Sequence, residues 1–387
     1  MIYLDNAATT RIAPEVLEAM MPYLTEQFGN PGSVHRIGRT SKDAVEHARC
    51  QVAELIGAKP EQIIFTSGAT EANNTVFHMV CGDLKRFDKR HIVTSAVEHK
   101  SVMKSVLNLV DCHGFDVTFA RVGAKLGAHS ENIMSAIQPD TGIVSCMNVN
   151  NEVGLGFDVE SIGKACNERG ILFHTDCVQA VGCRSIDVKK IGCDFATISS
   201  HKIHGPKGVG ALFVKDPSMW SPMIRGGDSQ EFGLRGGTEN VAGIVGFGAA
   251  CEIISKASME LAAERMEALK HAFLTSLNET MLKHGLSDVW RVNGVSDYGT
   301  KTINISVDRV DAQSLVLLAD KFGVCISAGS ACNSREDIPS HVLTAIGLTP
   351  AQARSSFRVS FSRMNTTQEA SDGGTLIGEC ISLLLGM

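Results

Sequence analysis

The chain lacks several features that would set its class apart at once. No Cys-x-x-Cys pair occurs among its 12 cysteines, which argues against a zinc ribbon or a thioredoxin motif. No apolar run is long enough to cross a membrane, and the first residues do not form a signal peptide. The formal net charge is −6 with dispersed Lys and Arg, unlike a nucleic-acid-binding surface. We therefore expect a cytoplasmic protein with no metal site, no membrane and no direct nucleic-acid contact.

What the chain does have is a regular alternation of apolar strand-like segments with helical patterns. The strand candidates lie near Ile63, Ile92, Val117, Val144, Leu172, Ala196 and Leu212. Helical patterns lie between several of them, as at 161–169. This order is typical of an α/β fold with a mostly parallel sheet and helices on both faces.

A helix-like stretch at 258–284, rich in good helix formers, follows the last of these segments. It predicts a connector to a smaller α+β domain, with strand candidates at 304–307 and 358–361. For a chain of 387 residues we expect a large domain at 15–257 and a small domain formed by 1–14 with 258–387.

A lysine stands at the end of one predicted strand. The segment 194–199 leads into Ser200, His201 and Lys202, and the glycine-rich run 205–210 follows. A lysine fixed at a strand end is well placed to form a Schiff base, and glycines let a cofactor approach the backbone. Since most lysines lie on the surface, His201 and Lys202 alone do not indicate a Schiff-base site, and other motifs along the chain must support it.

Two further strand ends carry polar residues. Asp176 follows the apolar run 171–173, where it could pair with a protonated pyridine nitrogen or cap the next helix. Thr70 follows strand 63–66 and Gly68, where a helix N-terminus could bind a phosphate. A plain helix cap is the alternative for Thr70. No Gly-Lys-Ser/Thr follows at Walker A spacing.

Other candidates are less specific on their own. His99 follows strand 91–94 and could stack on a planar cofactor, shuttle protons or be structural. Asn151 follows strand 143–147 and is either a turn residue or a ligand for a carboxylate. Cys332 lies among small and polar residues, which favours an accessible nucleophilic thiol, whereas Cys325 lies in an apolar context and is predicted to be buried.

Taken together, these motifs resemble one family, the cysteine desulfurases of the NifS/IscS type. These are fold-type I pyridoxal phosphate enzymes of the class V aminotransferase group. The resemblance runs from the first residues to about Arg363. The motifs that carry it lie, in chain order, at 3–10, 29–31, 66–71, 98–99, 150–152, 176–179, 201–202, 235–240, 329–332 and 356–361.

The resemblance implies a role for each matching position. It implies that Lys202 carries the pyridoxal phosphate, that Asp176 and Gln179 hold its ring nitrogen and hydroxyl, and that His99 stacks on the ring and assists proton transfer. The residues implied to hold the phosphate are Ala69, Thr70, Ser199, His201 and, from the neighbouring subunit of a dimer with shared sites, Thr238.

The same resemblance implies the reaction. Asn151 and Arg358 would bind the carboxylate of L-cysteine, and Cys332 would take its sulfur as a persulfide, releasing alanine. An acceptor protein would then receive the sulfur for iron–sulfur assembly, tRNA thiolation or DNA sulfur modification. The alternatives are a selenocysteine lyase, another class V aminotransferase, or a non-catalytic sulfur relay, which the presence of Lys202, Asp176 and His99 disfavours.

A few positions depart from the family's usual pattern. Ser200 replaces a common glycine, and Asn333 replaces a common serine or threonine. The segment 226–231 has one extra residue and lacks a histidine found in some relatives, and the C-terminal tail is short. None of these changes removes a predicted catalytic group, but they leave the sulfur acceptor open.

Overall fold

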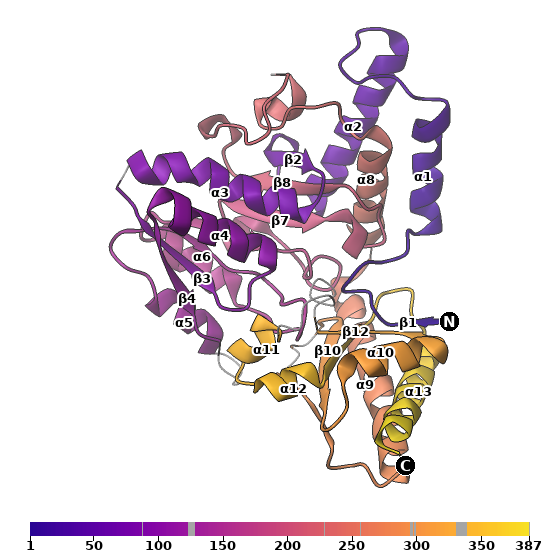
Figure 1. Cartoon of the computed structure of the whole chain (residues 1–387). Coiled ribbons are helices and arrows are strands. Elements are labelled where there is room, and N and C mark those ends of the chain that lie inside the picture. Colours follow the sequence, from indigo (N-terminus) through magenta and orange to yellow (C-terminus); the bar gives the residue numbers. More distant parts are fainter. Residues whose placement is uncertain are drawn as a thin grey trace.

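The computed structural model describes residues 1–86, 88–122, 128–227, 229–255, 257–294, 297, 299–329 and 339–386. Within these residues the chain folds around a seven-stranded sheet and a four-stranded sheet (Figure 1).

The seven-stranded sheet confirms the predicted α/β fold. Its spatial order is β2-β8-β7-β6-β5-β3-β4. The strands are β2 (Ile63–Thr66), β3 (His91–Ser95), β4 (Asp116–Ala120), β5 (Thr141–Ser145), β6 (Leu172–Asp176), β7 (Phe195–Ser199) and β8 (Gly210–Val214). The pairs from β4 through β7 are parallel, while β8 runs antiparallel to β7 and β2. The short glycine-rich connection after β7 explains this reversal, since a parallel return needs a longer crossover.

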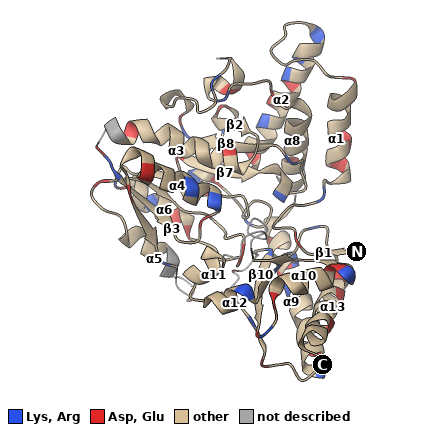
Figure 2. Ribbon diagram, in the orientation of Figure 1, with Lys and Arg blue, Asp and Glu red and all other residues tan. Residues whose placement is uncertain are grey.

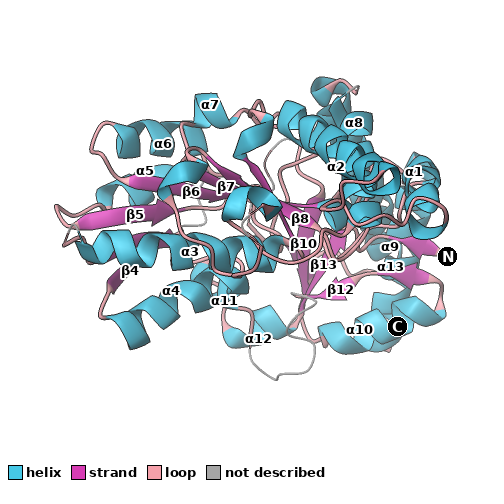
Figure 3. Ribbon diagram, turned by 90° about the horizontal axis from the view of Figure 1, so that it is seen from above, coloured by secondary structure: helices cyan, strands magenta, loops and turns pink. Residues whose placement is uncertain are grey.

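Helices cover both faces of this sheet, so its central strands are buried on both sides. One face packs against α3 (Ala69–Arg86) and α4 (Lys100–His113), while the other packs mainly against α2 (Arg36–Leu55), α6 (Val159–Asn167) and α8 (Val241–Ser255) (Figure 3). Strand β2 shows the alternation, because Ile63 and Phe65 face α2 while Ile64 faces α3. The remaining elements on this part of the chain are α1 (Pro14–Thr25), α5 (Ala128–Ser135), α7 (Val188–Ile191), η1 (Pro60–Gln62), η2 (Ser200–Lys202), η3 (Pro217–Met219) and η4 (Gln230–Gly233).

The second sheet is antiparallel, with the order β12-β13-β10-β9. Its strands are β9 (Trp290–Val292), β10 (Thr302–Val307), β12 (Ser327–Ala328) and β13 (Ser356–Ser360). Two long helices, α9 (Met259–Lys283) and α13 (Thr367–Leu385), pack with it into one apolar core. The shorter helices here are α10 (Ala312–Lys321), α11 (His341–Ala345) and α12 (Pro350–Arg354).

The predicted helix boundaries were close to the observed ones. Helix α9 begins one residue after Ser258, whose side chain accepts a hydrogen bond from Leu261 N–H and so caps the helix. Helix α6 begins two residues earlier than predicted, because Asp158 is its capping residue.

The N-terminal segment joins the two sheets. Strand β1 (Ile2–Tyr3) pairs in parallel with β11 (Val324–Cys325), and Leu4 enters the core of the second sheet. Farther along, Thr10 N–H donates to the carbonyl of His201 at 2.9 Å, directly after β7. The two larger sheets fall on either side of the predicted domain division at 257/258, which itself stays a prediction.

Charged side chains are scattered over many elements of the ribbon in Figure 2. In the described part of the chain, no single helix is long and apolar enough to cross a membrane. The pair α8 and α9 meets that length and composition only when both helices are taken together across an 89° bend.

Candidate active site

A cavity of about 550 Å³ lies where the carboxyl ends of β3, β5, β6 and β7 meet the N-terminal segment and the second sheet. This is where open α/β sheets bind ligands. The predicted residues that line the cavity are Ala69, Thr70, His99, Asn151, Asp176, Gln179, Ser199, His201, Lys202 and Arg358. The structure therefore brings together ten positions from six segments spread over residues 69–358.

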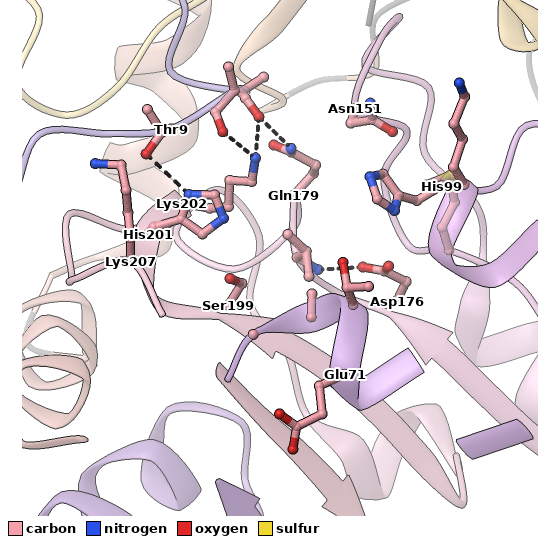
Figure 4. Close-up of a pocket in the computed structure, with 18 of the residues that line it drawn as sticks. Thr9, Glu71, His99, Asn151, Asp176, Gln179, Ser199, His201, Lys202 and Lys207 are labelled. Carbon is pink, nitrogen blue, oxygen red and sulfur yellow. Dashed lines mark hydrogen bonds between the residues drawn. The ribbon is translucent and has the colours of Figure 1, made fainter. Parts of the chain in front are cut away.

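Lys202 ends the short turn η2 that follows β7. Its Nζ donates to the carbonyl oxygens of Ala7 and Ala8, at 2.6 Å each (Figure 4). These carbonyls belong to the N-terminal segment, so the amine is held against the mouth of the cavity by residues almost two hundred positions away. The amine points toward the group of side chains that includes Gln179.

Asp176 is the last residue of β6 and is 5 % exposed. Its Oδ1 accepts a hydrogen bond from Val178 N–H at 3.0 Å, and its Oδ2 accepts one from Asn73 Nδ2 at 2.9 Å. Among the described residues, no Lys, Arg or His forms an ion pair with this carboxylate. The carboxylate is therefore available to a cationic ring nitrogen. Its hydrogen bond from Val178 N–H caps a turn, and not the helix that was the alternative expectation.

His99 caps the N-terminus of α4 through its Nδ1. That atom accepts from the backbone N–H of Ser101 at 3.2 Å and lies 2.8 Å from Ser101 Oγ. A backbone N–H can only donate, so Nδ1 is the acceptor and the ring proton is on Nε2. Burial lowers the pKa of His99 although the Asp176 carboxylate opposes the shift, and Lys202 lowers it further, so the imidazole is neutral near pH 7.

Asn73 connects the two groups just described. Its Nδ2 donates both to Asp176 Oδ2 and to Ser101 Oγ, the latter at 2.8 Å. Ser101 Oγ then reaches His99 Nδ1. A continuous buried chain of hydrogen bonds thus fixes the carboxylate and the imidazole relative to each other.

The geometry of the cavity suits pyridoxal phosphate. Gln179 Nε2 donates to Ala7 O at 3.1 Å, while its Oε1 is buried with no hydrogen-bond partner in the described structure. An acceptor left without a donor is costly unless a ligand hydroxyl meets it. Gln179, Asp176 and Lys202 therefore present an acceptor, an anion and an amine to one planar ligand.

The other end of the cavity suits a phosphate. Helix α3 begins at Ala69, after Gly68 with φ 149°, a conformation that favours glycine. A side chain at Gly210 would approach the Gly68 Cα to 2.8 Å, so the glycine at position 210 permits this close packing. The helix N-terminus, Thr70 and Ser199 line this end together with Lys207.

His201 lies at the same end of the cavity. Its Nδ1 is 3.1 Å from Thr9 Oγ1 (Figure 4). Burial and the neighbouring charges of Lys202 and Lys207 lower the pKa of His201 to about 3. The ring is neutral and contributes hydrogen bonding without charge.

Arg358 reaches the cavity from β13 and is 2 % exposed. One terminal nitrogen donates to Asp5 Oδ1 at 2.8 Å and to Ser327 Oγ, and the other donates to the carbonyl of Asn151 at 3.0 Å. Its Nε is buried and has no partner among the described residues. Asp5 therefore orients a guanidinium that retains donor capacity for a carboxylate.

Two predicted residues differ from the rest. Thr238 is exposed and lines a neighbouring hollow of about 100 Å³ with Gly208 and Arg235. Cys332 lies outside the described residues. The chain on either side of its segment is fixed near the cavity, since Ser327 pairs with Arg358 and His341 Nε2 lies 2.9 Å from the carbonyl of Glu98. Cys325, predicted to be buried, is half-buried.

Sequence reasoning missed several residues of the site. Asn73 and Ser101 lie within helical patterns, where nothing distinguishes them from surface polar residues. Glu98 is fully buried, and burial raises its pKa to about 8. The only available signal was proximity in sequence, since Ser101 follows His99 by two positions and Asn73 follows Thr70 by three.

Comparison with known proteins agrees with this geometry. The chain matches the family described as aminotransferase class-V over residues 2–372. It is 40 % identical over 368 residues to a cysteine desulfurase IscS of Dictyoglomus turgidum, covering 95 % of this chain and 91 % of that protein. The chain therefore belongs to the class V aminotransferase family.

Within that family it groups with the cysteine desulfurases. A solved structure titled NIFS-like protein superposes with a TM-score of 0.87 at 32 % identity, covering 99 % of each chain. A second, titled SspA in complex with cysteine, superposes with a TM-score of 0.77 at 34 % identity, covering 95 % of this chain and 100 % of that one. The predicted resemblance and fold are confirmed.

Proposed function

We propose that the protein is a pyridoxal-phosphate-dependent cysteine desulfurase that transfers sulfur from L-cysteine to Cys332 and releases L-alanine. The observation that carries the proposal is the convergence of Lys202, Asp176 and His99 on one cavity. The family membership and the cysteine-bound relative support the choice of substrate.

Bound pyridoxal phosphate would supply an electron sink for the carbon skeleton of the substrate. Asp176 would hold the ring nitrogen in its protonated form, and Gln179 Oε1 would accept from the ring hydroxyl. Ala69, Thr70, Ser199 and His201 would hold the phosphate. The Lys202 amine would leave the carbonyls of Ala7 and Ala8 to bind the cofactor.

The remaining residues would act on the substrate. Arg358 and Asn151 would fix its carboxylate, which orients the Cα–H toward Lys202. Lys202, once released by the substrate, would take the Cα proton. His99, neutral with its proton on Nε2, would stack on the ring and assist proton transfer.

Cys332 would act as the nucleophile toward sulfur. Its thiolate would attack the substrate sulfur, forming the S–S bond of a persulfide as the C–S bond breaks and its electrons return to the carbon skeleton. An acceptor protein would then take the outer sulfur. Iron–sulfur assembly, tRNA thiolation and DNA sulfur modification all fit this step, and a cytoplasmic location is part of the same proposal.

A homodimer is also part of the proposal. Apolar side chains on and after α1 are exposed, with Leu24 58 %, Phe28 75 % and Val34 89 % accessible. An exposed apolar patch of this kind marks an interaction surface. The role that the resemblance implies for Thr238, a contact with the phosphate of a neighbouring subunit's site, requires such a second copy, and Thr238 is exposed in the single chain.

The test is a pair of cysteine variants in the full-length protein. Cys332→Ser should bind pyridoxal phosphate, show the visible spectral change on adding cysteine, and release no sulfide, while Cys325→Ser should behave as wild type. Lys202→Ala should lose both the covalent cofactor and turnover. Normal sulfide release by Cys332→Ser would refute the mechanism, and transamination retained in Cys332→Ala would favour an aminotransferase.

A further inference from the structure

An acidic residue stands at the end of the cavity that suits a phosphate. Glu71 lies in the first turn of α3, and it lines the cavity together with Ser67, Thr70 and Lys207. Its side chain is 9 % exposed. In Figure 4 its carboxylate points away from Lys202. A negative charge is therefore built into the helix end that is expected to bind an anionic group.

This position stabilises Glu71 but opposes a phosphate beside it. An acidic side chain in the first turn of a helix is stabilised by the helix dipole. Glu71 Oε2 also accepts a hydrogen bond from the Ser67 N–H at 2.8 Å. The same helix N-terminus would bind the phosphate. Because two anions at one helix end repel each other, Glu71 without a counter-ion would weaken phosphate binding.

Arg235 supplies that counter-ion. Its Nε donates to Glu71 Oε1 at 2.9 Å, and one of its terminal nitrogens donates to Oε2 at 3.3 Å. One guanidinium thus contacts both oxygens of one carboxylate, which is the geometry of the stronger ion pairs. The Arg235 side chain is 24 % exposed, so solvent and salt screen this pair less than a surface pair.

Glu71 is charged in the folded protein. Burial raises the pKa of its carboxyl group, but the hydrogen bonds from Arg235 and Ser67 outweigh burial and hold that pKa below its ordinary value. The pair of Glu71 and Arg235 therefore has no net charge at neutral pH. The N-terminus of α3 and Lys207 then face the cavity without an opposing charge from Glu71.

The segment that carries Arg235 is attached to the large sheet at a second point. Glu231 in this segment pairs with the Arg49 guanidinium of α2 at 2.8 Å. Its Oε2 also accepts a hydrogen bond from the N–H of Phe65 on β2. These contacts hold the segment independently of Glu71, so a substitution at Arg235 removes a charge while this attachment remains.

We propose that Arg235 is a positioning residue for the cofactor phosphate: it neutralises Glu71, so that the N-terminus of α3 can accept a second anion. Arg235 acts through Glu71 and does not itself touch the phosphate. The inference rests on the proposed function, in which this end of the cavity holds the phosphate of pyridoxal phosphate.

The experiment compares two ligands that differ only in the phosphate. Cofactor-free, full-length protein is titrated with pyridoxal phosphate and, separately, with pyridoxal, and absorbance is followed. Arg235→Met removes the charge and the donors, whereas Arg235→Gln keeps a donor without the charge. Glu71→Gln and the double variant Arg235→Met/Glu71→Gln complete the cycle. Arg291→Met, which breaks an ion pair with Asp308 beside the second sheet, is the control.

Both Arg235 variants should bind pyridoxal phosphate about tenfold more weakly, because each leaves one uncompensated negative charge beside the phosphate. Glu71→Gln, the double variant and the control should stay within about threefold of wild type, since none of them leaves that charge unpaired. Pyridoxal affinity should stay within about twofold in every variant, because pyridoxal has no phosphate to repel. Rescue of Arg235→Met by Glu71→Gln is the result that a merely structural role of Arg235 would not give.

Wild-type affinity for pyridoxal phosphate in both Arg235 variants would overturn the proposal. A double variant as weak as Arg235→Met would also overturn it, because Arg235 would then act through its own segment and not through Glu71. Thermal unfolding shows which variants are folded, and Arg235→Gln serves where Arg235→Met is not. A wild-type protein that binds no pyridoxal phosphate would refute the proposed function and this inference together, whereas normal binding without the rescue refutes this inference alone.

Discussion

Asn73 offers the sharpest test of how the site is organised, because the next residue in the chain is its matched control. Asn73→Ala removes the donor to Asp176 Oδ2 and the donor to Ser101 Oγ. Asn74→Ala removes an exposed bond from Nδ2 to the carbonyl of Thr70 in the same helix. Both variants remove an asparagine side chain, at adjacent positions of one helix, but only the side chain of Asn73 contacts the buried site residues.

The magnitude follows from the two bonds. A buried hydrogen bond to a carboxylate contributes about 1.5–3 kcal/mol. Without it, Asp176 is less well oriented and solvated as an anion, and its hold on a protonated ring nitrogen weakens. We expect pyridoxal phosphate affinity to fall by about 10–100-fold in Asn73→Ala, the equivalent of about 1.4–2.8 kcal/mol. Asn74→Ala should change it by less than about twofold, as usual for an exposed site.

The assay is a titration of cofactor-free, full-length protein with pyridoxal phosphate, followed by visible absorbance, with unfolding measured in parallel. Equal affinities for Asn73→Ala and Asn74→Ala would refute the reasoning, because the buried bond chain would then not support Asp176. A large loss in both variants would place the effect in helix α3 as a whole.

Three further predictions concern the surroundings of the site. Arg358→Lys keeps the charge but loses the planar donors, so cysteine binding, measured by spectral titration, should weaken by about 1.5–3 kcal/mol. The cofactor content should not change, and a loss of cofactor would instead assign Arg358 to the cofactor site. Glu231→Gln leaves the buried Arg49 guanidinium, 2.8 Å from Glu231, with only the half-exposed Glu46 as a counter-ion, and should lower the free energy of unfolding in urea by up to about 3 kcal/mol; a change under about 1 kcal/mol would contradict this. Burial raises the pKa of Glu98 from 4.5 to about 8, so this carboxyl group is neutral in the folded protein. The free energy of unfolding should therefore decline as the pH rises from 4.5 to 8. Glu98→Gln should flatten that decline, and an unchanged slope would rule Glu98 out as its source.

Much of the fold was predictable because its signals are local. Each apolar run became a strand of the large sheet, and Ser258 marks the start of α9 as a helix-capping residue does. The site residues at strand ends were predictable for the same reason, since the carboxyl ends of parallel strands share one edge of the sheet.

The rest depended on contacts that have no local signal. Asn73 and Asn74 are adjacent asparagines in one helical pattern, and only the rotation of α3 against the sheet decides which one contacts Asp176. Gln179 is 172 positions from Ala7, and nothing in its own segment indicates that it donates to the carbonyl of that residue. Their roles arise from packing between elements, which no pattern within a single element contains.

The path of the first ten residues has a consequence for synthesis. Ile2 pairs with Val324 and Asp5 bridges Ser360, and both partners are synthesised after the whole of the large sheet. The large sheet can assemble earlier, as domains do during synthesis. Ala7 and Ala8 therefore take their places beside Lys202 only after the strand that carries Ser360 has been synthesised. The nascent chain consequently exposes Lys202 before its pocket is closed, and a change within residues 2–8 would disturb a late assembly step and not the formation of the large sheet.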